Sequence, residues 1–162
     1  TISFGQSFQI TPMQLLGAAA SIVNGGHKII PHFGIDILDE DGKVIQNLNY
    51  TTDKQTISKE TSDTMKEILW QVVENGGGNK AYIEGYEIGG KTATSQKLPR
   101  GSGKYIASFV GFVPYNDPKV MAMCIINEPQ GVYYGGTIAA PVIQNVFDNI
   151  LPYLGMEKNN NS

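Results

Sequence analysis

The 162-residue sequence contains one cysteine, two histidines and no long apolar run. The single cysteine, Cys124, excludes a disulfide within the chain, and the two histidines add too few further ligands for a structural zinc site. No stretch approaches the roughly 18 consecutive apolar residues of a membrane-spanning helix. The N-terminal residues also lack the charged region and following apolar region of a secretion signal. We therefore expect no metal, no cofactor and no membrane span in these residues.

Charge is scarce as well. Charged residues make up 17% of the chain and hydrophobic residues 41%, and the formal net charge is -3. Typical domains have roughly 25% charged and 45–50% hydrophobic residues, so this is a globular composition that excludes intrinsic disorder for most of the chain. The length fits one domain with a sizeable core. Lysine and arginine are scattered singly and form no basic stripe, so we expect no nucleic-acid partner.

Start and stop signals predict three helices. The first follows Thr11, a favourable N-cap, and ends at the glycine pair 25–26. The second begins near Ser58 and ends at the three glycines 76–78. The third covers about 137–153, and its apolar residues are spaced to pack on one face of a sheet.

Other apolar residues follow the two-residue period of strands. Between the first two helices, the turn 39–42 joins two short runs into a hairpin. From Tyr86 onward three strand-like runs follow. The link 114–119 between the last two is too short for a parallel crossover. We therefore predict a meander of three antiparallel strands over 86–128.

Together these elements predict an α+β fold in which helices flank a three-stranded antiparallel sheet. Residues 1–85 contain two helices and the hairpin, 86–128 the meander and 137–153 the C-terminal helix. We expect the polar residues 157–162 to form a disordered tail, so the folded part ends near residue 156. The chain begins without methionine, and we expect it to be part of a longer protein.

Residues 85–92, Gly-Tyr-Glu-Ile-Gly-Gly-Lys-Thr, formally match the phosphate-binding loop of nucleotide hydrolases. That loop requires a buried strand before its first glycine and a helix after its lysine, because helix amides bind the phosphates. Here a glycine-rich helix terminator precedes the motif, and a β-branched run ending at Pro99 follows it. The context therefore favours a chance match, and a nucleotide hydrolase stays a remote alternative.

Lys91 and Thr92 can instead lie in a strand. Two adjacent glycines, Gly89 and Gly90, allow another backbone to come close, as a substrate peptide lying along the strand would. A plainer interpretation is an edge strand that its lysine protects from aggregation. The residues alone leave both interpretations open.

Several segments resemble the penicillin-binding transpeptidases. Residues 89–96 and 105–114 look like the third and fourth strands of that family. Residues 4–6, 10–15 and 24–26 resemble its later helical segment, and residues 126–131 and 133–142 resemble its fifth strand and C-terminal helix. The similarity is greatest to the monofunctional class B enzymes of division and sporulation, of the stage V sporulation protein D type. It implies the C-terminal part of a transpeptidase domain, with a partial β-lactamase-like fold.

Members of this family use a Ser-x-x-Lys motif with the acylated serine, a Ser-x-Asn motif and a Lys-Thr-Gly motif. Only the third has a counterpart here, because no serine is followed by lysine three residues on or by asparagine two residues on. We expect the missing motifs before Thr1, in the N-terminal half of the same domain. The resemblance therefore implies that the parent protein is a serine-type D,D-transpeptidase and that this chain alone is inactive.

The resemblance also assigns roles on the third strand. Lys91 would supply positive potential to the substrate carboxylate and to the proton network of the nucleophile. Thr92 would hydrogen-bond that carboxylate, and the Thr94 backbone N–H would be one of two oxyanion donors. Ala93 occupies the position of the family glycine, where its methyl group could crowd the substrate backbone. The implied ligands are D-Ala-D-Ala stem peptides of peptidoglycan and the β-lactams that imitate them, with no metal or cofactor.

Two further expectations concern partners. Without the first two strands of the family sheet, strand 120–126 would have an unpaired apolar edge, which predicts pairing with the N-terminal half or self-association. Family members are anchored by an N-terminal span with the catalytic domain outside the cytoplasm, so the resemblance implies membrane attachment only through such an anchor. A non-catalytic transpeptidase-like module for binding or assembly is the alternative function.

Overall fold

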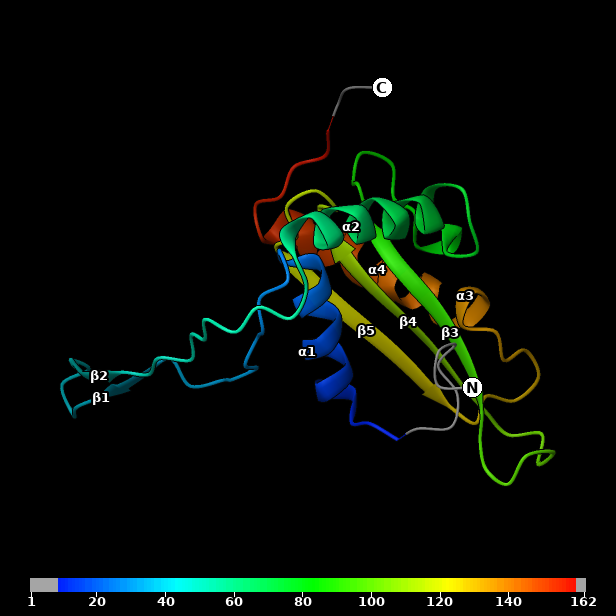
Figure 1. Cartoon of the computed structure of the whole chain (residues 1–162), viewed down its shortest axis with the longest axis horizontal. Coiled ribbons are helices and arrows are strands. Elements are labelled where there is room, and N and C mark those ends of the chain that lie inside the picture. The colour runs from blue at the N-terminus through cyan, green and yellow to red at the C-terminus, as the bar shows by residue number, and fades with distance from the viewer. Residues whose placement is uncertain (1–8, 160–162) are drawn as a thin grey trace.

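A computed structural model of the chain describes residues 9–159. These residues form a three-stranded antiparallel sheet with helices on both faces, and a two-stranded hairpin that projects from the body (Figure 1). Helices α1 (Pro12–Val23) and α2 (Lys59–Glu74) lie on one face, and α3 (Gly135–Ile138) and α4 (Ala140–Tyr153) on the other. The predicted α+β fold is confirmed.

Local capping residues start the first two long helices. The Thr11 hydroxyl accepts a hydrogen bond from the Gln14 N–H at 3.2 Å, and the Gln14 side-chain oxygen accepts one from the Thr11 N–H at 3.1 Å. This reciprocal capping box satisfies two amides that lack partners within the helix. At α2, the Ser58 hydroxyl accepts from the Thr61 N–H at 3.2 Å. Both predicted helix starts are thus confirmed.

The predicted helix over 137–153 is two helices. Helix α3 begins earlier than expected, at Gly135, and α4 begins at Ala140 after a break at Ala139. Pro141 explains the break, because it has no N–H to donate to the carbonyl of Thr137 one turn earlier. A short 3₁₀ helix, η2 (Asn79–Ala81), follows α2.

The main sheet consists of β3 (Gly89–Gln96), β4 (Tyr105–Val113) and β5 (Val120–Asn127) in the order β3-β4-β5. Both pairs of neighbours are antiparallel, which confirms the predicted meander. Within residues 9–159, β5 pairs only with β4 and β3 only with β4, so each outer strand has an open edge.

The core lies between the sheet and α4. Phe109 and Val113 of β4 pack against Ile143, Phe147 and Leu151 of α4, and all five side chains are buried. On the opposite face, α1 and α2 cover the sheet less completely, and Ile125 of β5 stays 40% exposed. Burial of the α4 face therefore supplies most of the apolar stabilisation of the sheet.

Gly89 and Gly90 have a different role from the one considered above. A Cβ at Gly89 would lie 2.3 Å from Cζ of Phe112, and one at Gly90 would lie 2.4 Å from Cζ of Phe109. Both glycines are buried beneath these two rings of β4. They therefore make room for aromatic side chains of the chain itself, and their presence does not require an approaching substrate.

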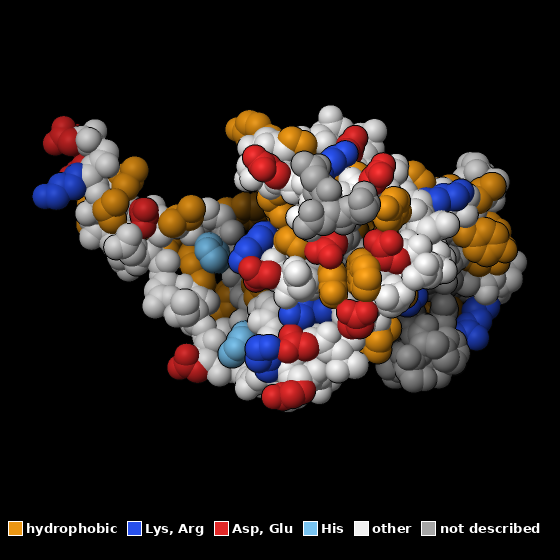
Figure 2. Space-filling view, turned by 90° about the horizontal axis from the view of Figure 1, so that it is seen from above, with side chains coloured by type: hydrophobic (Ala, Val, Ile, Leu, Met, Phe, Trp, Pro, Cys, Tyr) orange, Lys and Arg blue, Asp and Glu red, His pale blue; other side chains and the backbone are white. Residues whose placement is uncertain are grey.

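The predicted hairpin is present as β1 (Asp36–Leu38) and β2 (Val44–Asn47). The Asp39 carboxylate accepts the N–H groups of Asp41 and Lys43 at 3.1 and 2.8 Å and so closes the turn. Both strands are exposed along their whole length. Figure 2 shows the hairpin standing clear of the body, with acidic and basic side chains interspersed on the visible face of the molecule.

The described part of the tail, residues 157–159, runs back along the body. Asn159 donates its N–H to the Gly85 carbonyl at 2.8 Å, and the Lys158 ammonium lies 5.6 Å from the centre of the Tyr86 ring. The rest of the expected tail, 160–162, lies outside the described residues, as does the segment 4–6. Among the described helices, none has both the length and the apolar character needed to cross a membrane.

Candidate functional site at the outer edge of β3

The side chains of β3 alternate between the two faces of the sheet, as a strand requires. Lys91 lines a pocket on the α1/α2 face. On the other face, the Thr94 hydroxyl accepts a hydrogen bond from the Gly135 N–H of α3 at 3.1 Å. Thr92 shares this second face, whereas Ala93 shares the face of Lys91 and is exposed. The predicted site residues therefore lie together but do not all face the same way.

The hydrogen-bond ladder sets the direction of each peptide group of β3. Lys97, just beyond the strand, donates its N–H to the Lys104 carbonyl at 2.9 Å, so these two residues form a hydrogen-bonded pair. Such pairs alternate with non-hydrogen-bonded pairs along an antiparallel ladder. In the register of β3 with β4, the N–H groups of Thr92 and Thr94 therefore point away from β4. The Thr94 N–H is directed to the outer edge of β3.

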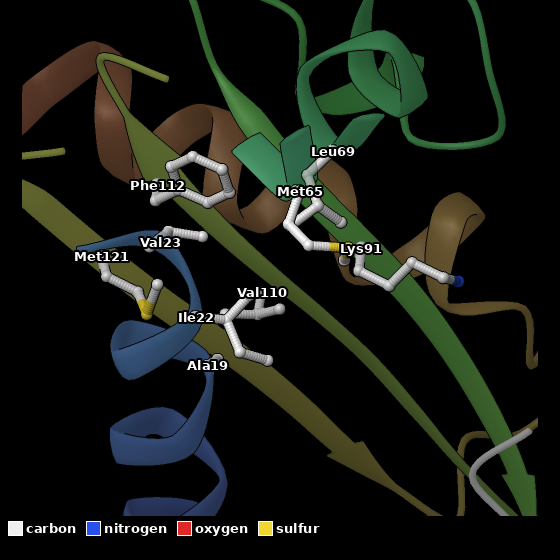
Figure 3. Close-up of a pocket in the computed structure, with 10 residues that line it drawn as sticks. Ala19, Ile22, Val23, Met65, Leu69, Lys91, Val110, Phe112 and Met121 are labelled. Carbon is white, nitrogen blue, oxygen red and sulfur yellow. The ribbon is translucent and has the colours of Figure 1, made fainter. Parts of the chain in front are cut away.

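Lys91 brings a positive charge to the same edge. Its side chain is exposed, and its Nζ donates to the Thr92 carbonyl at 2.7 Å. The ladder also directs that carbonyl away from β4. In Figure 3 the ammonium points away from the apolar pocket while the aliphatic part of the side chain lies at its rim.

Next to Lys91, a pocket of about 330 Å³ lies between α1, α2 and the sheet (Figure 3). It is lined by Ala19, Ile22, Val23, Met65, Leu69, Gly90, Lys91, Val110, Phe112 and Met121. The lining is apolar apart from the lysine. An apolar wall, one cation and an outward N–H on one strand edge suit an extended peptide that carries a carboxylate.

The two buried serines have structural hydrogen bonds. Ser62 accepts the Gly25 N–H at 3.0 Å, which joins α2 to the end of α1. Ser21 donates to the Gly17 carbonyl at 2.8 Å within α1. The Ser21 hydroxyl also accepts the Ile29 N–H at 3.3 Å, so both hydroxyls join α1 to neighbouring segments. Across residues 9–159 no group of three or more His, Cys, Asp or Glu side chains could hold a metal ion.

Sequence reasoning missed two residues around β3. Gly135 lies just before the predicted helix over 137–153 and was given no role, yet a Cβ there would lie 2.3 Å from the carbonyl oxygens of Ala93 and Ser108. A side chain is therefore excluded where α3 rests on β3 and β4. Glu128 was the other. It has φ = 52°, and its carboxylate contacts Lys97 and Lys104 at the opposite ends of the β3–β4 loop.

The ion bridge changes the titration of Glu128. Hydrogen bonds from Lys97, and then from Lys104, hold the pKa of the Glu128 carboxyl below its ordinary value, against the opposing effect of partial burial. No sequence spacing predicts this bridge, because its members come from the ends of three strands. The only signal in the sequence is a negative residue after the apolar run of β5, together with two lysines that flank the loop between β3 and β4.

The phosphate-loop alternative is wrong. Lys91 and Thr92 lie inside β3, and the chain continues as a strand to Gln96. The helix whose amides would bind phosphates after the lysine is therefore replaced by a strand.

Comparison with known proteins gives one consistent family. The family described as "Penicillin binding protein transpeptidase domain" matches residues 1–148. Stage V sporulation protein D of Bacillus subtilis is 37% identical over 99% of this chain. The chain spans only 26% of the length of that relative.

Two solved structures agree with this assignment. The D,D-transpeptidase domain of a peptidoglycan glycosyltransferase from Eggerthella lenta superposes with a TM-score of 0.79 and 26% identity, over 92% of this chain and 34% of that one. Penicillin-binding protein 3 of Mycobacterium tuberculosis, complexed with aztreonam, superposes with a TM-score of 0.84 over 98% of this chain and 38% of that one. At 22% identity, this similarity shows a shared fold. With the family match over residues 1–148, the chain belongs to the penicillin-binding protein transpeptidase domains.

Proposed function

We propose that this chain supplies one wall of the active site of a peptidoglycan D,D-transpeptidase. The observation that carries the proposal is the shared edge of β3, where the Lys91 ammonium and the outward Thr94 N–H lie on one strand. The family assignment supports a transpeptidase, and the share of the relative that is matched supports a longer parent protein. The parent protein then provides the rest of the site.

In the proposed reaction, a serine outside this chain attacks the carbonyl carbon of the penultimate D-Ala of a stem peptide. The bond to the terminal D-Ala breaks, and that residue leaves as a free amine after taking up the proton that the serine hydroxyl has lost. An amine of a neighbouring stem then attacks the ester, forms the cross-link and gives one of its own protons to the released serine oxygen.

The residues of β3 act in this reaction by position. Lys91 attracts the carboxylate of the terminal D-Ala and raises the positive potential around the serine proton network. Thr92 is the hydrogen-bond donor to that carboxylate, and the Thr94 N–H stabilises the negative oxygen that develops on the carbonyl. Ala93 lies between them, and its exposed methyl group narrows the space for the substrate backbone.

β-Lactams are the second class of ligand in this proposal. The Mycobacterium tuberculosis relative was crystallised with aztreonam, which supports a pocket of this fold accepting such compounds. The β-lactam carbonyl takes the place of the peptide carbonyl at the Thr94 N–H. Ring opening then leaves an acyl-enzyme on the serine of the parent protein.

The remaining part of the domain also completes the sheet. Among residues 9–159 β5 has an open edge, and an open apolar edge favours strand addition. We infer that the N-terminal half of the same domain covers this edge, and that the isolated chain self-associates through it. We propose that the parent protein lies at the outer face of the cell membrane, attached through an anchor elsewhere in its sequence.

Two substitutions in the parent protein test the oxyanion role. Thr94→Pro removes the N–H, and an edge strand tolerates proline where the N–H points outward. Thr94→Val removes only the hydroxyl. We expect Thr94→Pro to slow acylation by a fluorescent penicillin about a hundredfold or more beyond Thr94→Val.

Gln96→Pro is the matched control, since Gln96 has the same outward position two residues further along β3. Thermal unfolding shows whether each variant folds. Equal acylation rates for folded Thr94→Pro and Thr94→Val would remove Thr94 from the oxyanion site. A parent protein that no penicillin acylates would favour the non-catalytic alternative.

A further inference from the structure

The ends of the three strands of the main sheet meet at one carboxylate. Glu128 follows β5, and its two oxygens lie 2.5 Å from the Lys97 Nζ and 3.2 Å from the Lys104 Nζ. Lys97 comes directly after β3, and Lys104 directly before β4. Lys97 also donates to the Asn127 side chain at 3.1 Å. Glu128 therefore links all three strands of the sheet at the end where β3 and β5 finish and β4 begins.

This ion bridge is supported by backbone geometry. Glu128 has φ = 52°, a left-handed conformation that few residues other than glycine adopt. In that conformation its N–H donates to the Tyr105 carbonyl at 2.9 Å, which continues the β4–β5 ladder by one pair. The backbone thus turns the side chain back across β4 toward the β3–β4 loop. About two-thirds of the Glu128 side chain is covered, as its relative exposure is 31%.

A second connection runs from Glu128 to β3 through the following loop. The ring of Tyr133 stacks on that of Tyr105 with centroids 4.0 Å apart. Two residues later, the Gly135 N–H donates to the Thr94 hydroxyl at 3.1 Å. The segment that Glu128 begins therefore returns to the strand three residues before Lys97. Thr94 is therefore held directly by Gly135 on one side, and the end of its strand is held three residues later by the contact of Glu128 with Lys97.

We propose that Glu128 is a positioning residue for the transpeptidase site: its bridge to Lys97 and Lys104 holds the end of β3 and so fixes the direction of the Thr94 N–H. This inference rests on the function proposed above for β3. The strand needs such a restraint because, within residues 9–159, only β4 pairs with it. A shift of about 1 Å in a catalytic donor is enough to slow a reaction markedly.

The test uses Glu128→Gln in the full-length parent protein. Glutamine keeps the size of the side chain and one acceptor oxygen, but it removes the charge and replaces the second acceptor with an NH2 donor, so it cannot bridge both lysines. The matched control is Asp117→Asn, which breaks the Asp117–Lys119 ion pair of 2.7 Å in the turn at the opposite end of the sheet. Acylation by a fluorescent penicillin is measured over a range of concentrations, so that initial binding and the chemical step are separated.

We expect Glu128→Gln to slow the chemical step about fivefold while initial binding stays within about twofold. Asp117→Asn should change neither quantity. Lys97→Gln should reproduce the loss, and the double variant should be no slower than either single variant, because both act through one bridge. A loss confined to initial binding, or additive losses in the double variant, would overturn the proposal.

A purely structural role is distinguished by two further readouts. Raising the salt concentration should slow the chemical step of the unsubstituted protein toward the rate of Glu128→Gln, because salt screens the exposed side of the bridge. The Glu128→Gln rate should respond much less. If every variant retains full acylation rates, Glu128 has no positioning role; if the parent protein is not acylated at all, the proposed function fails first.

Discussion

The α4 face and the α1/α2 face of the same sheet are packed very differently. On the α4 face, Phe109 packs with Phe147 and Ile143, and none of these three side chains is more than 2% exposed. On the α1/α2 face, Ile125 is 40% exposed and a pocket of about 330 Å³ stands beside Lys91. Both faces are built from the same three strands, so the difference arises from what covers them.

The two faces of the sheet therefore serve different purposes: the α4 face stabilises the fold, and the α1/α2 face offers a binding site. A dry, filled interface stabilises the sheet through apolar burial and dispersion. An apolar pocket with one cation at its rim is instead a place where something can bind. The strand that carries Lys91 and Thr94 therefore has one face anchored to α3 and one face left accessible.

The largest expected effect is on the closed face. Phe147→Ala removes a fully buried ring and should lower the free energy of unfolding by about 3–5 kcal/mol. Ile125→Ala on the open face should cost less than about 1.5 kcal/mol, because that side chain is partly exposed already. Urea unfolding followed by circular dichroism measures both. Similar losses at the two positions would contradict the contrast between the faces.

A substitution between α3 and the sheet should have the next largest effect. Gly135→Ala places a methyl group 2.3 Å from two backbone oxygens, so α3 must move, at a cost of about 1–3 kcal/mol. The movement also disrupts the hydrogen bond to Thr94. Gly77→Ala is the control, since a Cβ there meets no atom within 4 Å. Thermal unfolding should separate the two variants clearly, and an unchanged midpoint for Gly135→Ala would argue against the close contact.

The end of the sheet offers a test by pH. The pKa of Glu128 is held below its ordinary value by Lys97 and Lys104, so its contribution to stability is present above the ordinary carboxyl pKa. That contribution is lost as the pH falls through the lowered pKa, when the carboxylate is protonated. The thermal midpoint should therefore fall less steeply for Glu128→Gln than for the unsubstituted chain below about pH 4. Parallel curves would show that the bridge adds no stability.

The smallest expected effect is on the accessible face of β3. Ala93→Gly in the parent protein removes an exposed methyl group beside the proposed substrate path, and we expect acylation by a penicillin to quicken about two- to fivefold. The change is small because one methyl group is a modest obstacle. Stopped-flow acylation measures it, and indistinguishable rates would show that the methyl group does not matter.

Local signals in the sequence were sufficient for most of the elements. The caps Thr11 and Ser58 act within one helical turn, so their pattern predicted both helix starts correctly. The meander followed from strand period and from the short link 114–119. The break at Ala139 was missed, although Pro141 is a local reason for it.

The site was less accessible to sequence reasoning. The resemblance identified Lys91 to Thr94 as a group, and the register of β3 gives the direction of their peptide groups. The residues left the role of Gly89 and Gly90 open, because only the folded sheet places Phe112 and Phe109 over them. Glu128 could not be found, since its partners are distant in sequence and meet only through the sheet.

The most direct measurement of the central proposal is intact-protein mass spectrometry after incubation with a penicillin. The 162-residue chain and its full-length parent protein are treated in parallel. We predict one penicilloyl group per parent molecule, on a serine outside this chain, and no covalent adduct on the chain alone. An adduct on any serine within these 162 residues, or none on the parent protein, would contradict the account.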